Sequence, residues 1–168
     1  MAVVRRIAAI FTLALFAQGA GADDLIPPDP WEVVHKVRAL GTAEVGRDDF
    51  RDPVIRAELS TDDDDFSKLR YEVSFYGCDL GRDCTSILLS LRLFDESWGR
   101  QPPAKTVFAT WNREKLVGRA WRDPSGRAVL DHAVIIGRGI PPQMLERTLA
   151  AWATAMREFA DHIDFPGK

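Results

Sequence analysis

The segment from Leu69 to Phe94 predicts a β-hairpin with Cys78 and Cys84 at its tip. If the two cysteines lie opposite one another, they fix which residues of the two strands pair. Because side chains alternate between the two faces of a strand, this register makes one face wholly apolar, with the pairs Leu69 and Leu93, Tyr71 and Leu91, Val73 and Leu89, Phe75 and Ile87. The other face is polar apart from Tyr76 and Leu88. The cysteine positions and the apolar pattern therefore agree on one register, with a core face and an open face.

The two cysteines are interpreted as a structural disulfide, because two cysteines in a chain exported to an oxidising compartment most simply pair. A zinc site needs about four ligands, and the three histidines, His35, His132 and His162, are scattered along the chain. A redox pair usually has about two intervening residues, whereas five separate Cys78 from Cys84. No metal site and no cofactor are predicted.

The N-terminus has the pattern of a secretory signal peptide. Arg5 and Arg6 precede an apolar run over residues 7–17, and small residues end at Ala22, where we predict cleavage. The apolar run is too short for a membrane span. An N-terminal anchor helix is the less favoured alternative, since no later stretch is apolar enough to hold the chain in a bilayer. The expected protein is exported, periplasmic or secreted, and does not span the membrane.

Residues 23–30 form a proline-rich extended lead-in, and residues 31–164 have the size of a single domain. Loss of the two arginines in the signal peptide leaves 20 basic against 25 acidic residues. This negative balance argues against a nucleic-acid surface, which needs concentrated positive charge. The acidic run over residues 62–65 lacks the glycine and glutamate positions of a calcium-binding loop, and we predict a solvated turn there.

Three segments have the periodicity of amphipathic helices. The first covers Trp31–Leu40 and ends at Gly41. The second begins with Pro103 in its first turn; its apolar stripe is Ala104, Val107, Phe108 and Trp111, with Asn112, Arg113 and Lys115 on the opposite side. The third opens at Pro141-Pro142 and carries the stripe Leu145, Leu149, Trp152, Met156, Phe159 and Ile163. That stripe could form a coiled-coil seam with a second copy, but packing on the sheet is favoured.

The remaining strands are expected at Ala43–Ser60, as one or two strands broken near Pro53, and in a second hairpin over residues 117–136. The turn Asp123-Pro124-Ser125-Gly126 suits a type I turn followed by a left-handed residue. Its register places Arg119 opposite Asp131 on one face and His132 on the core face. A lone histidine there is more often a hydrogen-bonded core residue than a ligand or a pH switch.

The expected fold class of the chain is α+β, an antiparallel sheet of about five strands covered by helices in the order α-β-β-β-α-β-β-α.

A set of short motifs, in their order along the chain, resembles the YbjN-domain family from about Trp31 to Ile163. The motifs are Phe75-Tyr76-Gly77-Cys78, Cys84-Thr85-Ser86, Trp111-Asn112-Arg113 with Lys115, Gly118-Arg119-Ala120 and Val129-Leu130-Asp131. The resemblance implies a fold similar to type III secretion chaperones. It also implies a role as a bacterial sensory transduction regulator, a description that specifies no ligand and no reaction.

Trp111, Asn112, Arg113 and Arg119 match the family pattern, and Asp131 preserves its outward-facing acid. The family usually continues Leu-Glu-Met-Asp-Val where this chain has Leu130-Asp131-His132-Ala133-Val134. His132 therefore replaces an inward-facing methionine, and Ala133 lacks the second acid. A function that depends on two acids along this strand is not expected here.

No nucleophile elbow, phosphate-binding glycine loop or zinc-protease helix is found in the sequence. Asp131 and His132 are adjacent on a strand and therefore point to opposite faces. A non-enzymatic module that binds a protein or peptide is the favoured hypothesis, with Tyr76 and Leu88 as its candidate binding face. These two residues could equally be scattered surface apolar residues. The alternatives are a hydrolase of envelope material whose site is not visible in the sequence, and a monomer or homodimer with a structural role through the C-terminal helix.

Overall fold

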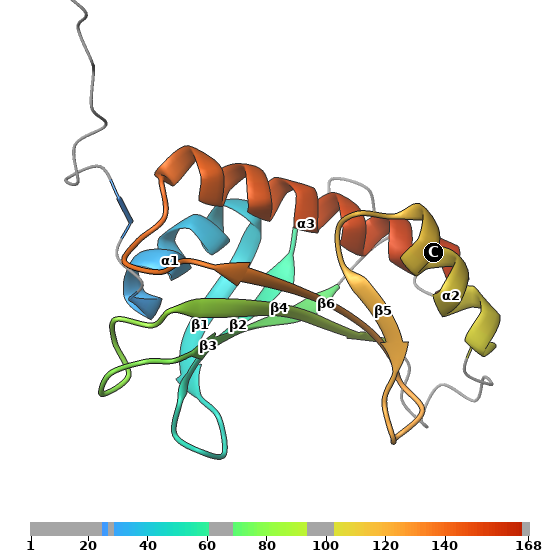
Figure 1. Ribbon diagram of the computed structural model, residues 1–168, viewed down its shortest axis with the longest axis horizontal. Coiled ribbons are helices and arrows are strands. Elements are labelled where there is room, and N and C mark those ends of the chain that lie inside the picture. Colours follow the sequence, from blue (N-terminus) through green and yellow to red (C-terminus); the bar gives the residue numbers. More distant parts are fainter. Residues whose placement is uncertain (1–24, 27–28, 61–68, 94–102, 166–168) are drawn as a thin grey trace, which may run out of the picture.

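The computed structural model describes residues 25–26, 29–60, 69–93 and 103–165. In these residues, helices cover one face of a six-stranded antiparallel sheet and leave the other face open (Figure 1). The helices are α1 (Pro30–Val37), the short 3₁₀ helix η2 (Arg38–Leu40), α2 (Lys105–Glu114) and α3 (Pro142–His162). The strands are β1 (Gly41–Arg47), β2 (Pro53–Leu59), β3 (Arg70–Tyr76), β4 (Ser86–Leu93), β5 (Arg119–Arg122) and β6 (Ala128–Ile135), in the spatial order β1-β2-β3-β4-β6-β5.

The α+β class is confirmed, with six strands instead of about five. The extra strand arises because the segment predicted as one or two strands forms a complete hairpin, β1 and β2. The carboxylate of Asp48 closes its turn by accepting hydrogen bonds from the main-chain N–H groups of Phe50 (2.9 Å) and Asp52 (2.8 Å). Aspartate commonly stabilises turns in this way. The break predicted near Pro53 lies at residues 48–52, between the two strands, and Pro53 is the first residue of β2.

The register predicted for the hairpin of β3 and β4 is confirmed. Tyr71 pairs with Leu91, and Val73 pairs with Leu89, so the apolar residues share the face that the helices cover. Cys78 and Cys84 form a disulfide at the tip. The cysteines therefore join the two ends of this turn, as the sequence indicated.

The second hairpin, formed by β5 and β6, also has its predicted register, with Arg119 opposite Asp131. Gly126 has a φ of 86°, the left-handed conformation expected after a type I turn. The carboxylate of Asp123 accepts hydrogen bonds from the main-chain N–H (2.8 Å) and the Nε (2.7 Å) of Arg127. This carboxylate fixes the turn that joins the two strands.

Helix α3 packs through its predicted apolar stripe and α2 through Phe108 and Trp111, whereas Ala104 lies before α2 and is exposed. Every stripe residue of α3 is buried, so these side chains belong to the core, and a dimer through this helix would have to use its outer side. Helix α2 begins at Lys105, two residues after Pro103, because Ala104 is still extended. Trp111 of α2 packs edge-on against Phe159 of α3, with ring centroids 5.1 Å apart. The two helices thus form one layer over the sheet.

The signal segment and the acidic run over residues 62–65 lie outside the described residues. None of the helices described by the structure combines the length and apolar character that a membrane crossing requires.

Candidate functional site

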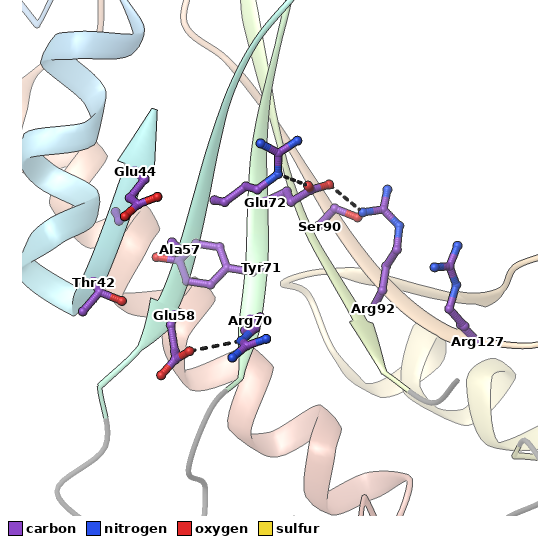
Figure 2. Close-up of a pocket in the computed structure, with 12 residues that line it drawn as sticks. Thr42, Glu44, Ala57, Glu58, Arg70, Tyr71, Glu72, Ser90, Arg92 and Arg127 are labelled. Carbon is purple, nitrogen blue, oxygen red and sulfur yellow. Dashed lines mark hydrogen bonds and ion pairs between the residues drawn. The ribbon is translucent and has the colours of Figure 1, made fainter. Parts of the chain in front are cut away.

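The open face of the sheet contains a broad depression of about 960 Å³ (Figure 2). It crosses β1 to β4, and most of the side chains around it are charged. Its lining includes Thr42, Glu44, Arg56, Glu58, Arg70, Glu72, Ser90, Arg92 and Arg127. Figure 2 shows how these side chains project from neighbouring strands toward the same side of the sheet.

Cross-strand ion pairs organise the charged part of this face. Glu72 lies between two arginines, 3.3 Å from the Nε of Arg56 and 2.9 Å from an Nη of Arg92. Glu58 pairs with the Nε of Arg70 at 3.1 Å. Such partly exposed pairs contribute only about 0–1 kcal/mol each to stability. They place charges of both signs side by side on this face.

A buried polar contact joins three strands beside this depression. Ser90 of β4 is only 2% exposed, and its Oγ donates a hydrogen bond of 2.6 Å to Oδ1 of Asp131 on β6. Trp121 of β5 donates through Nε1 to Oδ2 of the same carboxylate at 2.7 Å. Asp131 is therefore held by two neutral donors, although Arg119 is its partner in the strand register.

Two residues of the family motif attach α2 to β5. Trp111 donates through Nε1 to the main-chain oxygen of Gly118 at 3.0 Å. Asn112 makes two hydrogen bonds to the main chain of Ala120, of 2.7 and 2.8 Å. The prediction that Asn112 lies on the side of α2 opposite the apolar stripe is therefore wrong. The helix runs close to β5, so Trp111 and its neighbour Asn112 both reach that strand.

Of the other motif residues, Lys115 stays close to this contact, with its Nζ 5.6 Å from the centroid of the Trp111 ring. Arg113 is exposed and pairs with Glu114, while Lys115 pairs with Glu158 of α3 at 2.8 Å. Asn112, Lys115, Arg119 and Asp131 of the motif line one shallow groove, and Arg113 is not among its lining residues. Trp111 and Asn112 position α2, and Asp131 ties together the strands of the open face.

The candidate binding residues Tyr76 and Leu88 both lie on the open face. Tyr76 is 51% exposed and Leu88 is partly buried. The pairing of β4 with β6 places Ala133 beside Leu88 and Ile135 beside Ser86, which itself pairs with Tyr76. Ile135 is 80% exposed. We refer to Tyr76, Leu88, Ala133 and Ile135 together as the apolar patch.

Sequence reasoning missed half of the apolar patch. Ala133 and Ile135 alternate along β6 with His132 and Val134, so the pattern of that strand could have placed them on the face opposite the core. Their position beside Leu88 depends on the pairing of β4 with β6, two strands separated in sequence by α2 and β5. No turn between β4 and β6 indicates this pairing.

His132 lies on the helix side of the sheet, opposite in direction to Asp131, as predicted. Its ring stacks on Trp152 with centroids 6.4 Å apart and an interplanar angle of 15°. Partial burial lowers the pKa of His132 below its ordinary value.

The other two histidines, His35 and His162, lie on α1 and α3. A ring nitrogen of His162 is 3.0 Å from the main-chain oxygen of Val107. Within the part of the chain that the structure describes, no three histidine, cysteine, aspartate or glutamate side chains gather as metal ligands.

Comparison with known proteins identifies the family. The family model named YbjN, with the description "Putative bacterial sensory transduction regulator", matches residues 51–165. No curated protein matches the chain. Among solved structures, the chain is similar to the type III secretion chaperone SycH of Yersinia pestis, in complex with a stable fragment of YscM2, at a TM-score of 0.39 and 10% identity. That match covers 74% of this chain and 95% of the chaperone chain. Because the family model matches most of the chain, from within the β1–β2 turn to just beyond α3, the protein belongs to the YbjN family.

Proposed function

We propose that this protein is an exported, non-enzymatic binding module that engages a segment of another protein through the open face of its sheet. The observation that carries the proposal is the apolar patch, which lies on the face that the described helices leave uncovered (Figure 1). Apolar groups gathered on an exposed face often mark a site of protein interaction. The sensory or regulatory description of the family is compatible with such a role.

The surroundings of the apolar patch also suit a protein partner. Protein interfaces commonly combine an apolar centre with a polar rim, and tyrosine is enriched among the residues that carry binding energy. Here Tyr76 and Ile135 would supply the apolar contacts. Glu72 and Arg92, farther along the same face, would supply the charged rim.

A hydrolase is the less favoured function because the nucleophile candidate on the open face has no base. The Ser90 hydroxyl donates to Asp131. In a serine hydrolase a histidine takes the serine proton and the acid orients that histidine. All three histidines of the chain lie on the helix side of the sheet, with His132 facing Trp152. The pair of Ser90 and Asp131 is therefore better explained as a structural contact.

Export to the periplasm or beyond is part of the proposal. It is supported by the N-terminal sequence pattern and by the disulfide between Cys78 and Cys84. Disulfides form and persist mainly in oxidising compartments. A binding module in that location would take part in envelope signalling or in handling another exported protein.

The proposal is tested by crosslinking the mature protein to its neighbours in the source cell, using wild type and the double variant Tyr76→Ala, Leu88→Ala. We expect a specific crosslinked protein with wild type that is lost with the double variant. The matched control is Phe50→Ala, which removes an exposed apolar side chain from the β1–β2 turn, away from the apolar patch. If wild type and the double variant recover the same proteins, binding through the sheet face is wrong.

A further inference from the structure

Strand β6 has a partner on both sides along only half of its length. Residues Ala128 to Asp131 pair with β4 on one side and β5 on the other. From His132 to Ile135, β6 pairs with β4 alone. Among the residues described, this part of β6 is therefore a free sheet edge. It begins next to Arg119, the first residue of β5.

The hydrogen-bonding groups at this edge belong to Ala133 and Ile135. The main-chain N–H of Ile136 donates to the oxygen of Thr85 at 3.0 Å, so Ile136 faces the extension of β4. Alternate residues of an antiparallel strand direct their N–H and C=O groups to opposite sides. The N–H and C=O groups of Ala133 and Ile135 therefore point away from β4, to the side where another strand could lie.

The segment between α2 and β5 does not pair with this edge of β6 because it is attached to α2. Gly118 has a φ of 81°, and a Cβ built there would come 2.7 Å from the side chain of Leu130. Its main-chain oxygen accepts the hydrogen bond from Trp111, which directs the chain toward α2. Gly118 therefore lies just before Arg119, the first residue of β5, which pairs with Asp131, and no other described strand pairs with the edge of β6 beyond that point.

A groove of about 510 Å³ lies where β5 begins. It is lined by Asn112, Lys115, Leu116, Gly118, Arg119, Asp131, His132 and Ala133. The Leu116 side chain is fully exposed at this groove. No ion pair between Arg119 and Asp131 is present in the described part of the chain, since the carboxylate is bound by Ser90 and Trp121. The groove therefore offers an apolar contact and a cationic group next to the free edge.

The opposite edge of the sheet, β1, is different. The Nε of Arg38 donates a hydrogen bond of 3.1 Å to the main-chain oxygen of Ala43, one of the groups at that edge. Native proteins commonly protect sheet edges from pairing with other chains. The described part of β6 has an exposed isoleucine at its edge instead of such a cover.

We infer that β6 binds an extended segment of the partner protein as an added strand, antiparallel to β6 and in line with β5. The inference rests on the proposed function and specifies the conformation of the partner. The segment alternates acidic and apolar residues. Its acidic side chains lie on the open face, where the one opposite Ala133 is nearest to Arg119, and its apolar side chains lie on the helix side near His132 and Val134. Another part of the partner contacts the apolar patch. Main-chain hydrogen bonds to Ala133 and Ile135 hold it, as in other cases of strand addition.

The first test uses a synthetic seven-residue peptide that alternates valine and glutamate, with blocked ends, and NMR spectra of the mature protein. We expect the peptide to shift the amide signals of Ala133 and Ile135 and to slow their hydrogen exchange. Methylation of the glutamate main-chain nitrogens removes the donors that face β6 and should weaken binding about tenfold or more. Methylation of the valine nitrogens, which face away, should leave binding nearly unchanged. A peptide with lysine in place of glutamate should bind more weakly because of Arg119.

Absence of any change at Ala133 and Ile135 with millimolar peptide would overturn the inference. Equal binding of the two methylated peptides would also overturn it, because strand pairing requires the donors to lie on one side only.

A second test separates this inference from the proposed function. Ala133→Pro removes an N–H at the free edge and leaves the N–H groups that pair with β4, and proline is tolerated at such edges. Val45→Pro is the matched control, because it removes an N–H at the outer edge of β1, outside the apolar patch. Thermal unfolding checks that both variants fold. Suppose that Ala133→Pro still crosslinks to the partner and that the double variant Tyr76→Ala, Leu88→Ala does not. Strand addition is then wrong, and binding through the sheet face stands. If Ala133→Pro loses the partner and Val45→Pro keeps it, strand addition is supported.

Discussion

The side chain of Asn112 binds both main-chain groups of Ala120, accepting from its N–H at 2.7 Å and donating to its oxygen at 2.8 Å. The side-chain amide thus hydrogen-bonds to β5 as the main chain of a neighbouring strand would, and it fixes α2 against β5. This contact helps to hold the chain in the path that leaves the edge of β6 open. It gives a structural role to a residue whose position in the family motif could have suggested a binding role.

Replacing Asn112 with alanine should lower the free energy of unfolding by about 2–4 kcal/mol, because two main-chain groups of the buried Ala120 lose their partner. Urea unfolding measures the change. Asn112→Asp keeps the acceptor and loses the donor, so its effect should be intermediate. Arg113→Ala removes an exposed neighbour and should change stability by about 0.5 kcal/mol or less. Equal effects of Asn112→Ala and Arg113→Ala would contradict this role.

Replacing Ser90 with alanine should lower the free energy of unfolding by about 1–3 kcal/mol, because the Asp131 carboxylate loses a buried charge-assisted hydrogen bond. Ser86→Ala, on the same strand and face but more exposed, is the control and should have a smaller effect. A catalytic serine would show the opposite behaviour, since its loss would abolish a reaction with little cost in stability. No loss of stability in Ser90→Ala would argue against the structural role.

Stability should depend on pH through His132. Burial lowers the pKa of His132 in the folded protein, so the unfolded chain takes up a proton at a higher pH than the folded one. The contribution of neutral His132 to the free energy of unfolding is therefore fully present above the ordinary histidine pKa of about 6.5. It is lost as the pH falls from there toward the lower folded pKa.

The measurement compares urea unfolding of wild type and His132→Met at several pH values between about 7 and 5. The free energy of unfolding should fall more steeply with decreasing pH in wild type than in His132→Met. His35→Gln, on the exposed side of α1, should behave like wild type. Parallel curves for wild type and His132→Met would show that His132 does not carry the pH dependence.

The disulfide should be present in the exported protein. Thiol titration of the unfolded, unreduced mature protein should find no free thiol, and two free thiols would contradict the pairing. Replacing both Cys78 and Cys84 with alanine should lower the free energy of unfolding by about 2 kcal/mol, because the crosslink closes only a short loop. Double replacement avoids leaving one unpaired cysteine.

The sequence predicted the local parts of the fold well. The registers of both hairpins follow from turn residues and alternation near in sequence, as at Cys78 and Gly126. It did not predict that β6 lies beside β4, because no local signal joins strands separated by a helix and another strand. For this reason the contact of Ser90 with Asp131, and the place of Ile135 in the apolar patch, became visible only in the structure.

The most direct test of binding through the open face is site-specific photocrosslinking in the source cell. Ser86 lies between Tyr76 and Ile135 across three neighbouring strands, so a photoreactive residue there should yield a discrete crosslinked protein. The same residue at Ala151, on the exposed side of α3, is the control. We expect a product from position 86 that is absent at position 151 and disappears with Tyr76→Ala, Leu88→Ala. The same products from both positions would contradict it.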